Sequence, residues 1–272
     1  MQFARLNDVT LHFQMIGSPE SRPLLVFANS LGTDFRIWRD VVVRLAGEFS
    51  ILTYDLRGHG LSDIGPMPCR IEDHAADLAG LLDLIGARQA TIVGVSVGGM
   101  IAQALCASRP DLVRALVLCD TAARIGDDAF WNNRIAAIEA NGIESIADAI
   151  LGRWFTPAFR RAGNPAFAGY RNMLIRQPVA GYVATCAALR DADLTAAASA
   201  IGVPTLCVVG DSDGSTPPAL VASLAKLIPD ARFEIIEACG HLPCIEQPEA
   251  LVGIMRAFFA LTGMETISHV SH

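Results

Sequence analysis

The chain has 272 residues, of which 52% are hydrophobic and 18% are charged, a composition typical of a globular protein with a sizeable core and not of a disordered one. The net charge of −7 argues against nucleic acid or an anionic membrane surface as the main partner. Lys226 is the only lysine and no glycine-rich loop runs into it, which excludes a Walker-type phosphate loop.

The sequence carries no secretory or membrane-spanning signal. Apolar and polar residues alternate from Gln2 to Gln14, and the one long uncharged stretch, 89–108, is interrupted by glycines, so it is better explained as a strand, a turn and a helix. The seven cysteines are odd in number, have no C-x-x-C spacing and mostly lie in apolar runs. They are expected to be buried, reduced thiols in a cytoplasmic protein. The sequence does not indicate an oligomeric state.

Over the first 120 residues, short apolar runs alternate with helical patterns. Most of these runs are continuously apolar, as is typical of strands buried on both faces. Strands that alternate with helices predict a mainly parallel sheet covered by helices. The expected strands are 9–15, 23–28, 50–54, 90–95 and 114–119, and the expected helices are 71–85 and 99–107.

The alternation stops after Asp120, and no buried-strand pattern occurs before about residue 200. Helices are expected in this interval, followed by two more strands, a closing helix and a frayed tail. The helices are 128–140, 143–155 and 178–190, the strands are 204–209 and 232–236, the closing helix is 248–261 and the tail is 264–272. One α/β core, residues 1–121 and 201–272, is therefore predicted to be interrupted by a helical cap over residues 122–200.

The distribution of charge follows this division. The cap, residues 122–200, holds eight arginines and seven acidic residues, so it carries a net charge of +1 while the rest of the chain carries −8. The cap is thus the less acidic part of the protein. This difference suits a small anionic molecule held beneath it.

The strongest chemical signal is the G-x-S-x-G sequence at residues 94–98. It follows a buried strand and precedes a helix, the setting in which a serine nucleophile projects above the sheet. Gly94 and Gly98 leave space for the tight turn, and the N-terminus of the helix points free N–H groups toward developing negative charge. Ser96 is therefore the predicted nucleophile.

A serine nucleophile needs a base and a group that orients the base. His241 follows the last predicted strand and is favoured as the base, with His59 as its one rival. Asp213 and Asp120 both end strands that precede His241 in the chain. Asp213 is favoured as the orienting acid because the glycine and serine residues around it allow its carboxylate to turn inward.

An oxyanion hole needs two backbone N–H donors. One is expected from Val97, directly after the nucleophile, and the second from Leu31, in the loop that follows the expected strand 23–28. Asn29 and Ser30 in the same loop are either polar loop residues or substrate contacts. The histidines and cysteines lack metal-ligand spacing, and the glycines of the turn do not fit a dinucleotide fingerprint, so neither a metal nor another cofactor is expected.

These residues together resemble the α/β-hydrolase family over nearly the whole chain. The shared motifs are Asn29-Ser-Leu-Gly32 with Trp38, Asp55-x-Arg-Gly-x-Gly-x-Ser62, the turn at Ser96, Gly210-x-x-Asp213-x-x-x-Pro217 and Gly240-His241. The resemblance implies a mostly parallel eight-stranded sheet flanked by helices, with a helical cap inserted between strands six and seven. Within the family the chain is most similar to the 3-oxoadipate enol-lactonases. The pointers are residues 29–34, 94–101 and the cap segment 181–193, whereas Val97 departs from the methionine expected there.

The resemblance implies a serine hydrolase that opens the lactone ester of 3-oxoadipate enol-lactone during the degradation of aromatic compounds. Such a substrate carries a free carboxylate, which needs a cationic or hydrogen-bonding partner. Arg134 is the predicted partner, since it lies three residues after Trp131 on one helix face; the alternative is that Trp131 packs inside the cap and Arg134 is solvated. Trp154 and its neighbour Arg153 form a second such pair.

Three other functions stay open. A carboxylesterase, a carbon–carbon bond hydrolase or a perhydrolase of the same fold would use the same triad, and only the pocket would separate them. An acyltransferase would exclude water from the acyl-enzyme. A ligand receptor built on a hydrolase scaffold is the non-enzymatic alternative. Dehalogenases and epoxide hydrolases use an aspartate nucleophile where this chain has Ser96.

Overall fold

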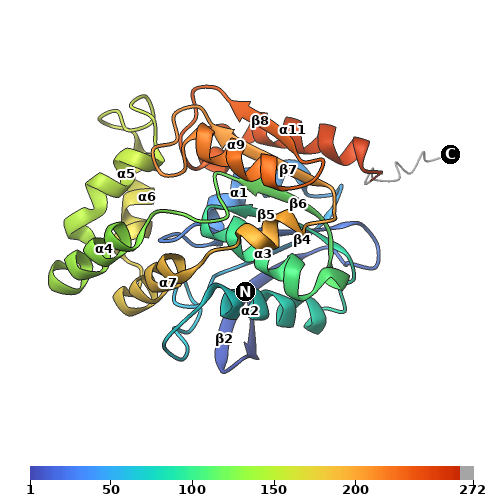
Figure 1. The fold of residues 1–272 in the computed structure, drawn as a ribbon, viewed down its shortest axis with the longest axis horizontal. Coiled ribbons are helices and arrows are strands. Elements are labelled where there is room, and N and C mark those ends of the chain that lie inside the picture. Colours follow the sequence, from blue (N-terminus) through green and yellow to red (C-terminus); the bar gives the residue numbers. More distant parts are fainter. Residues whose placement is uncertain (264–272) are drawn as a thin grey trace.

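A computed structural model describes residues 1–263, so the tail predicted for 264–272 lies outside the described residues. An eight-stranded sheet runs through the centre (Figure 1), in the order β1-β2-β4-β3-β5-β6-β7-β8. The strands are β1 (Gln2–Leu6), β2 (Val9–Ile16), β3 (Leu24–Ala28), β4 (Ser50–Tyr54), β5 (Ala90–Val95), β6 (Val113–Cys119), β7 (Thr205–Gly210) and β8 (Arg232–Ile236). β2 pairs antiparallel with both β1 and β4, and all other pairs are parallel. This confirms the mostly parallel eight-stranded sheet.

The helices of the core flank this sheet. α1 (Arg39–Leu45) packs against α11 (Pro248–Leu261) on one face, and α2 (Ile71–Leu84) packs against α3 (Val97–Ser108) on the other. The central strands β3, β4, β5 and β7 are buried along their whole length, which explains their continuously apolar sequences. The remaining short elements of the core are η1 (Phe35–Trp38), η2 (Pro110–Leu112), α9 (Pro218–Leu227) and α10 (Pro243–Glu246).

Between β6 and β7 every regular element is a helix, which confirms the predicted helical insertion. These helices project to one side of the sheet (Figure 1). They are α4 (Asp128–Asn141), η3 (Ile143–Ile146), α5 (Ala147–Trp154), α6 (Pro165–Ile175), α7 (Val179–Asp191) and α8 (Thr195–Ser199). The predicted helix 143–155 is divided into η3 and α5. The sequence analysis did not name α6, whose one fully buried position is Leu174. The division of the chain at residues 122 and 200 stays a prediction.

The loop after β4 belongs to the core and packs against one of the inserted helices. Its Arg57 donates to the Asp77 carboxylate through Nε at 2.6 Å and Nη2 at 2.7 Å, and both side chains are buried. A Cβ on Gly58 would lie 2.5 Å from the Cα of Gly181 in α7. Helix α7 therefore rests directly on the backbone of this loop, at a distance that only glycine allows.

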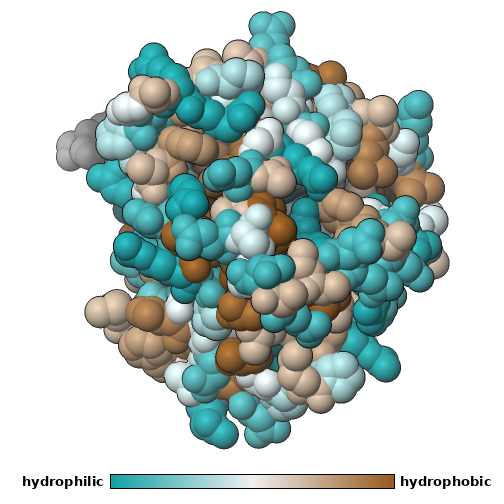
Figure 2. Space-filling model, turned by 90° about the vertical axis from the view of Figure 1, so that its left-hand side faces the viewer, coloured by the Kyte–Doolittle hydropathy of each residue, from teal (hydrophilic) through white to brown (hydrophobic). Residues whose placement is uncertain are grey.

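The surface and the thiols follow the sequence expectations. No helix within residues 1–263 is long and apolar enough to span a membrane. Figure 2 shows the side of the molecule where the inserted helices lie, and hydrophobic residues are visible there in recesses between hydrophilic ones. All seven cysteines are free and buried, as predicted.

Breaking the buried Arg57–Asp77 pair should destabilise the core, because the remaining charge would be buried without a partner. Arg57→Met leaves the buried Asp77 carboxylate without its cation, and we expect the free energy of unfolding to fall by about 3–5 kcal/mol. The control is Arg39→Met, which breaks the exposed pair with Asp40 and should leave stability nearly unchanged. Urea denaturation of both variants makes the comparison, and equal losses would contradict this assignment.

Candidate active site

Ser96 occupies the turn between β5 and α3 and has a left-handed backbone, with φ +59° and ψ −121°. This conformation is costly for any residue except glycine. The turn closes only because its neighbours lack side chains: a Cβ on Gly94 would lie 2.3 Å from the carbonyl oxygen of Gly98, and one on Gly98 would lie 2.3 Å from that of Ala28. The strained backbone holds the serine at the C-terminal end of β5, as the G-x-S-x-G pattern predicted.

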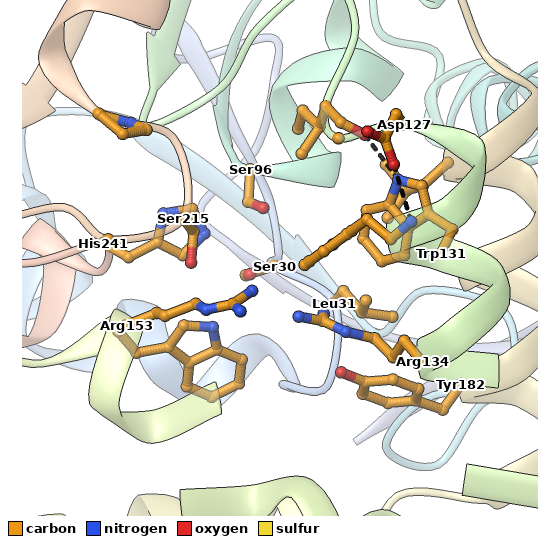
Figure 3. Close-up of a pocket in the computed structure, with 17 residues that line it drawn as sticks. Ser30, Leu31, Ser96, Asp127, Trp131, Arg134, Arg153, Tyr182, Ser215 and His241 are labelled. Carbon is orange, nitrogen blue, oxygen red and sulfur yellow. Dashed lines mark hydrogen bonds between the residues drawn. The ribbon is translucent and has the colours of Figure 1, made fainter. Parts of the chain in front are cut away.

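The Ser96 side chain faces a cavity of about 510 Å³ between the sheet and the inserted helices. Thr121 fixes the turn from behind by donating its hydroxyl to the Ser96 carbonyl oxygen at 2.6 Å. The Ser96 hydroxyl itself makes no hydrogen bond to any residue of the described part of the chain, 1–263, and only 8% of the residue is exposed. His241 lines the same cavity (Figure 3).

His241 is held by Asp213. The Nδ1 atom of His241 lies 2.9 Å from Oδ2 of Asp213, and both side chains are buried. Asp213 also accepts hydrogen bonds from the Ser215 and Thr216 amides and from the Thr216 hydroxyl. Burial raises the pKa of Asp213, but the His241 ring and these donors outweigh it and bring the pKa down to about 2. Asp213 is therefore ionised at neutral pH, and Nε2 is the nitrogen of His241 left to act as a base.

The C-terminal end of helix α5 supports both the acid and the base. The Gly214 amide donates to the Arg153 carbonyl at 3.2 Å, and the His241 amide donates to the Trp154 carbonyl at 2.8 Å. Carbonyl groups in the last turn of a helix have no partner within the helix. Here the loops that carry Asp213 and His241 supply those partners.

His59 and Asp120, the rival candidates for the base and the orienting acid, do not take those roles. His59 is fully buried, its Nδ1 lies 3.2 Å from the Arg57 carbonyl oxygen, and burial lowers its pKa; it does not line the cavity. Asp120 has an oxygen within 4.8 Å of Asp213 and of the His241 ring, but its Oδ1 accepts the Gly210 amide at 3.0 Å. The structure brings Asp213, not Asp120, into hydrogen-bond contact with His241.

The predicted oxyanion donors have free amides. Leu31 lines the cavity, and its N–H makes no hydrogen bond within the described residues 1–263. Val97 is the first residue of α3, so its amide has no partner inside the helix. Their role as an oxyanion hole stays a proposal.

The neighbouring residues Asn29 and Ser30 have different surroundings in the structure. Ser30 lines the cavity. Asn29 does not, because its amide is bonded within the core on both sides: Nδ2 donates to the Tyr54 carbonyl at 2.7 Å, and Oδ1 accepts from Trp38 Nε1 at 3.0 Å. Asn29 therefore supports the loop and is not available to a substrate.

Two arginines without carboxylate partners point into the cavity from opposite sides (Figure 3). Arg134 from α4 and Arg153 from α5 lie over the ring of Phe130, with guanidinium carbons 4.7 and 5.1 Å from its centroid. Neither makes an ion pair with any residue that the structure describes. Burial, followed by the charge of Arg134, lowers the pKa of Arg153. Among the described residues 1–263, the only carboxylate lining the cavity belongs to Asp127, which caps α4, so the two arginines leave the cavity electropositive.

The predicted aromatic residues also line this cavity. Trp131 and Trp154 both do so, and Trp131 donates its Nε1 to the Ile125 carbonyl at 2.6 Å. Trp131 thus offers a ring face and no free N–H. The sequence prediction missed Tyr182, whose buried hydroxyl lies beside the Arg134 guanidinium (Figure 3). It also missed Thr216. The only signal for Tyr182 was its place in the cap segment 181–193.

Comparison with known proteins agrees with this geometry. The family model described as alpha/beta hydrolase fold matches residues 23–248. Two 3-oxoadipate enol-lactonases of Acinetobacter baylyi are 32% and 33% identical to the chain, over 89% and 92% of it and 90% and 92% of their own lengths. The crystal structure of an enol-lactonase from Burkholderia xenovorans is 34% identical, with a TM-score of 0.91 over 95% of this chain and all of that one.

Replacement of Asn29 should affect stability and not substrate binding. Asn29→Ala leaves the buried Trp38 N–H and Tyr54 carbonyl without partners, and we expect the free energy of unfolding to fall by at least about 1–3 kcal/mol. The matched control is Ser30→Ala, the next residue, which lines the cavity and should leave stability nearly unchanged. Chemical denaturation and KM for an ester substrate measure the two effects. A raised KM in a fully stable Asn29→Ala protein would return Asn29 to the site.

Proposed function

This chain belongs to the α/β hydrolase family, and we propose that it is an enol-lactonase that opens the ring of 3-oxoadipate enol-lactone to give 3-oxoadipate. The observation that carries the proposal is the pair of unpaired arginines, Arg134 and Arg153, facing Ser96 across a small cavity. The similarity to enol-lactonases over nearly the whole chain supports the same conclusion. We propose that residues 1–121 and 201–272 supply the triad, and that the cap, residues 122–200, supplies the substrate contacts.

The cavity suits a small molecule with one ionised end. An arginine guanidinium binds a carboxylate in a fork-like geometry with two parallel hydrogen bonds. Two arginines held near each other without a counter-ion favour an anion more strongly than either does alone. The rings of Trp131 and Trp154 provide apolar walls for the carbon skeleton. A volume of about 510 Å³ fits a compact lactone.

In the proposed mechanism, Nε2 of His241 takes the proton of the Ser96 hydroxyl as its oxygen attacks the lactone carbonyl. The amides of Leu31 and Val97 stabilise the tetrahedral oxyanion. The intermediate collapses with cleavage of the bond between the acyl carbon and the ring oxygen, which leaves as an enolate. An enolate is a better leaving group than an ordinary alkoxide, and it stays tethered to the acyl chain.

The second half of the reaction uses the same groups. The His241 imidazolium returns its proton to the enolate, which becomes the ketone of the product. Water then loses a proton to Nε2 of His241 and attacks the acyl-serine, and the oxyanion is held by the same two amides. Collapse restores the Ser96 hydroxyl and releases 3-oxoadipate. Asp213 stays ionised throughout and fixes the orientation and tautomer of the histidine.

Steady-state kinetics on two substrates test this function. We expect hydrolysis of 3-oxoadipate enol-lactone, followed by loss of its ultraviolet absorbance, with kcat/KM above about 10⁴ M⁻¹s⁻¹. A neutral short-chain nitrophenyl ester should react much more slowly. Ser96→Ala serves as the blank and should be inactive on both. A fast ester with an idle lactone would make the protein a general carboxylesterase, and tight binding with a single turnover would indicate a receptor.

Removal of either cavity arginine should affect only the anionic substrate. For Arg134→Met and Arg153→Met we expect kcat/KM for the lactone to fall about 10- to 100-fold, the loss of a hydrogen bond to a charged group. The neutral ester should change less than about threefold. Arg124→Met, which removes an exposed cap arginine paired with Asp128, is the control. Equal losses on both substrates would show that the arginines act through the structure of the cap and not through charge.

A further inference from the structure

Asp120 is a buried carboxyl group that the proposed mechanism does not use. It directly follows β6, none of it is exposed, and its φ of +47° is left-handed. Its Oδ1 accepts the Gly210 amide at 3.0 Å. Its Oδ2 is buried and has no hydrogen-bond partner within residues 1–263. A buried carboxylate oxygen with no donor is costly, so its presence needs an explanation.

The groups around Asp120 are acids and thiols. One oxygen of Asp120, one oxygen of Asp213 and one ring nitrogen of His241 all lie within 4.8 Å of one another. The carboxyl of Glu246 and the thiols of Cys119, Cys239 and Cys244 are near enough to interact electrostatically with Asp120. Asp120 forms no ion pair with any residue of the described chain.

Two buried carboxyl groups at this separation cannot both be ionised at neutral pH. The donors decide which one keeps the charge. Asp213 accepts four hydrogen bonds, from two amides, one hydroxyl and the His241 ring, whereas Asp120 accepts only the Gly210 amide. Burial, and then the charge of Asp213, raise the pKa of Asp120 well above its ordinary value. The charge therefore lies on Asp213 and the proton on Asp120.

A proton on Oδ2 also resolves the missing partner. As a carboxylate, Oδ2 would need a donor, and none is present in the described chain. As an acid, its O–H needs an acceptor, and an oxygen of the Asp213 carboxylate lies within 4.8 Å of an oxygen of Asp120. Oδ1 meanwhile keeps the Gly210 amide, so both oxygens of Asp120 are satisfied.

We propose that Asp120 is a positioning residue that stays protonated during turnover and donates a hydrogen bond from Oδ2 to the Asp213 carboxylate. This inference rests on the proposed Ser96–His241–Asp213 triad. The added donor stabilises the negative charge of Asp213 and makes that carboxylate a weaker base. The His241 imidazolium then releases its proton more readily to the enolate. The proton of Asp120 is never transferred, so the reaction balances without it.

A neutral and a charged Asp120 can be told apart by how the pH at which His241 takes up its proton changes when Asp120 is replaced. If Asp120 is a neutral donor, Asp120→Ala makes Asp213 a stronger base, and His241 takes up its proton at higher pH than in the wild type. If Asp120 is ionised, the same variant removes a negative charge near the ring, and His241 takes up its proton at lower pH. Asp120→Asn keeps a donor and an acceptor in place without charge, so a neutral Asp120 predicts almost no shift.

The ring protons of His241 are to be titrated by NMR in the wild type and in both variants, beside the acidic limb of the kcat/KM profile. We expect the upward shift in Asp120→Ala, its reversal in Asp120→Asn, and at least tenfold more activity in Asp120→Asn than in Asp120→Ala. A downward shift in both variants would overturn the proposal. The NMR titration needs no substrate, so it reports on Asp120 even if the lactone is not the substrate.

A second readout is the carbonyl band of a protonated carboxylic acid in the infrared spectrum at neutral pH. It should be present in the wild type and absent in Asp120→Asn. Asp211→Asn, which removes an exposed carboxylate near Asp213, should leave it in place. Absence of the band from the wild type would overturn the proposal. So would stoichiometric zinc binding lost in Asp120→Asn together with inactivation by a chelator, because the cluster would then be a metal site.

Discussion

Two hydrogen bonds at the end of α5 set the geometry on which the site depends. The carbonyl oxygens of the consecutive residues Arg153 and Trp154 accept the amides of Gly214 and His241. The side chains of Arg153 and Trp154 line the cavity. The residues that hold the acid and base loops in place are thus the residues that face the proposed substrate. An anion bound by Arg153 would be positioned relative to His241 by one short, well-packed segment.

The charged groups around this segment are of two kinds: the buried Asp213, and the two cavity arginines, of which Arg134 is half-buried and Arg153 is exposed. Asp213 has four hydrogen-bond donors, so its charge is stable in the interior. Arg134 and Arg153 have aromatic rings near them but no carboxylate partner within residues 1–263. Their mutual repulsion is a standing cost that an anion would relieve. The arginines are already in place in the free protein, so an anionic substrate gains their attraction without a rearrangement, and a neutral one does not. This difference is the basis of selectivity by charge.

The sequence predicted the core well because its signals are local. Continuous apolar runs mark the central strands, and the Ser96 turn needs glycines that the sequence displays directly. The cap was predicted less completely: α6, which fully buries only Leu174, was not named. Asn29 was misjudged because its partners, Trp38 and Tyr54, lie on other elements. Only tertiary packing reveals that a polar loop residue is fully used by the core.

The central claim is that Ser96 faces an anion site made by two cap arginines. A crystal structure of the Ser96→Ala protein soaked with the lactone tests it most directly. The account predicts the carboxylate between Arg134 and Arg153, with the ring carbonyl oxygen within hydrogen-bond distance of the Leu31 and Val97 amides. A lactone bound with its carboxylate away from both arginines, or with its carbonyl pointing away from residue 96, would contradict the account.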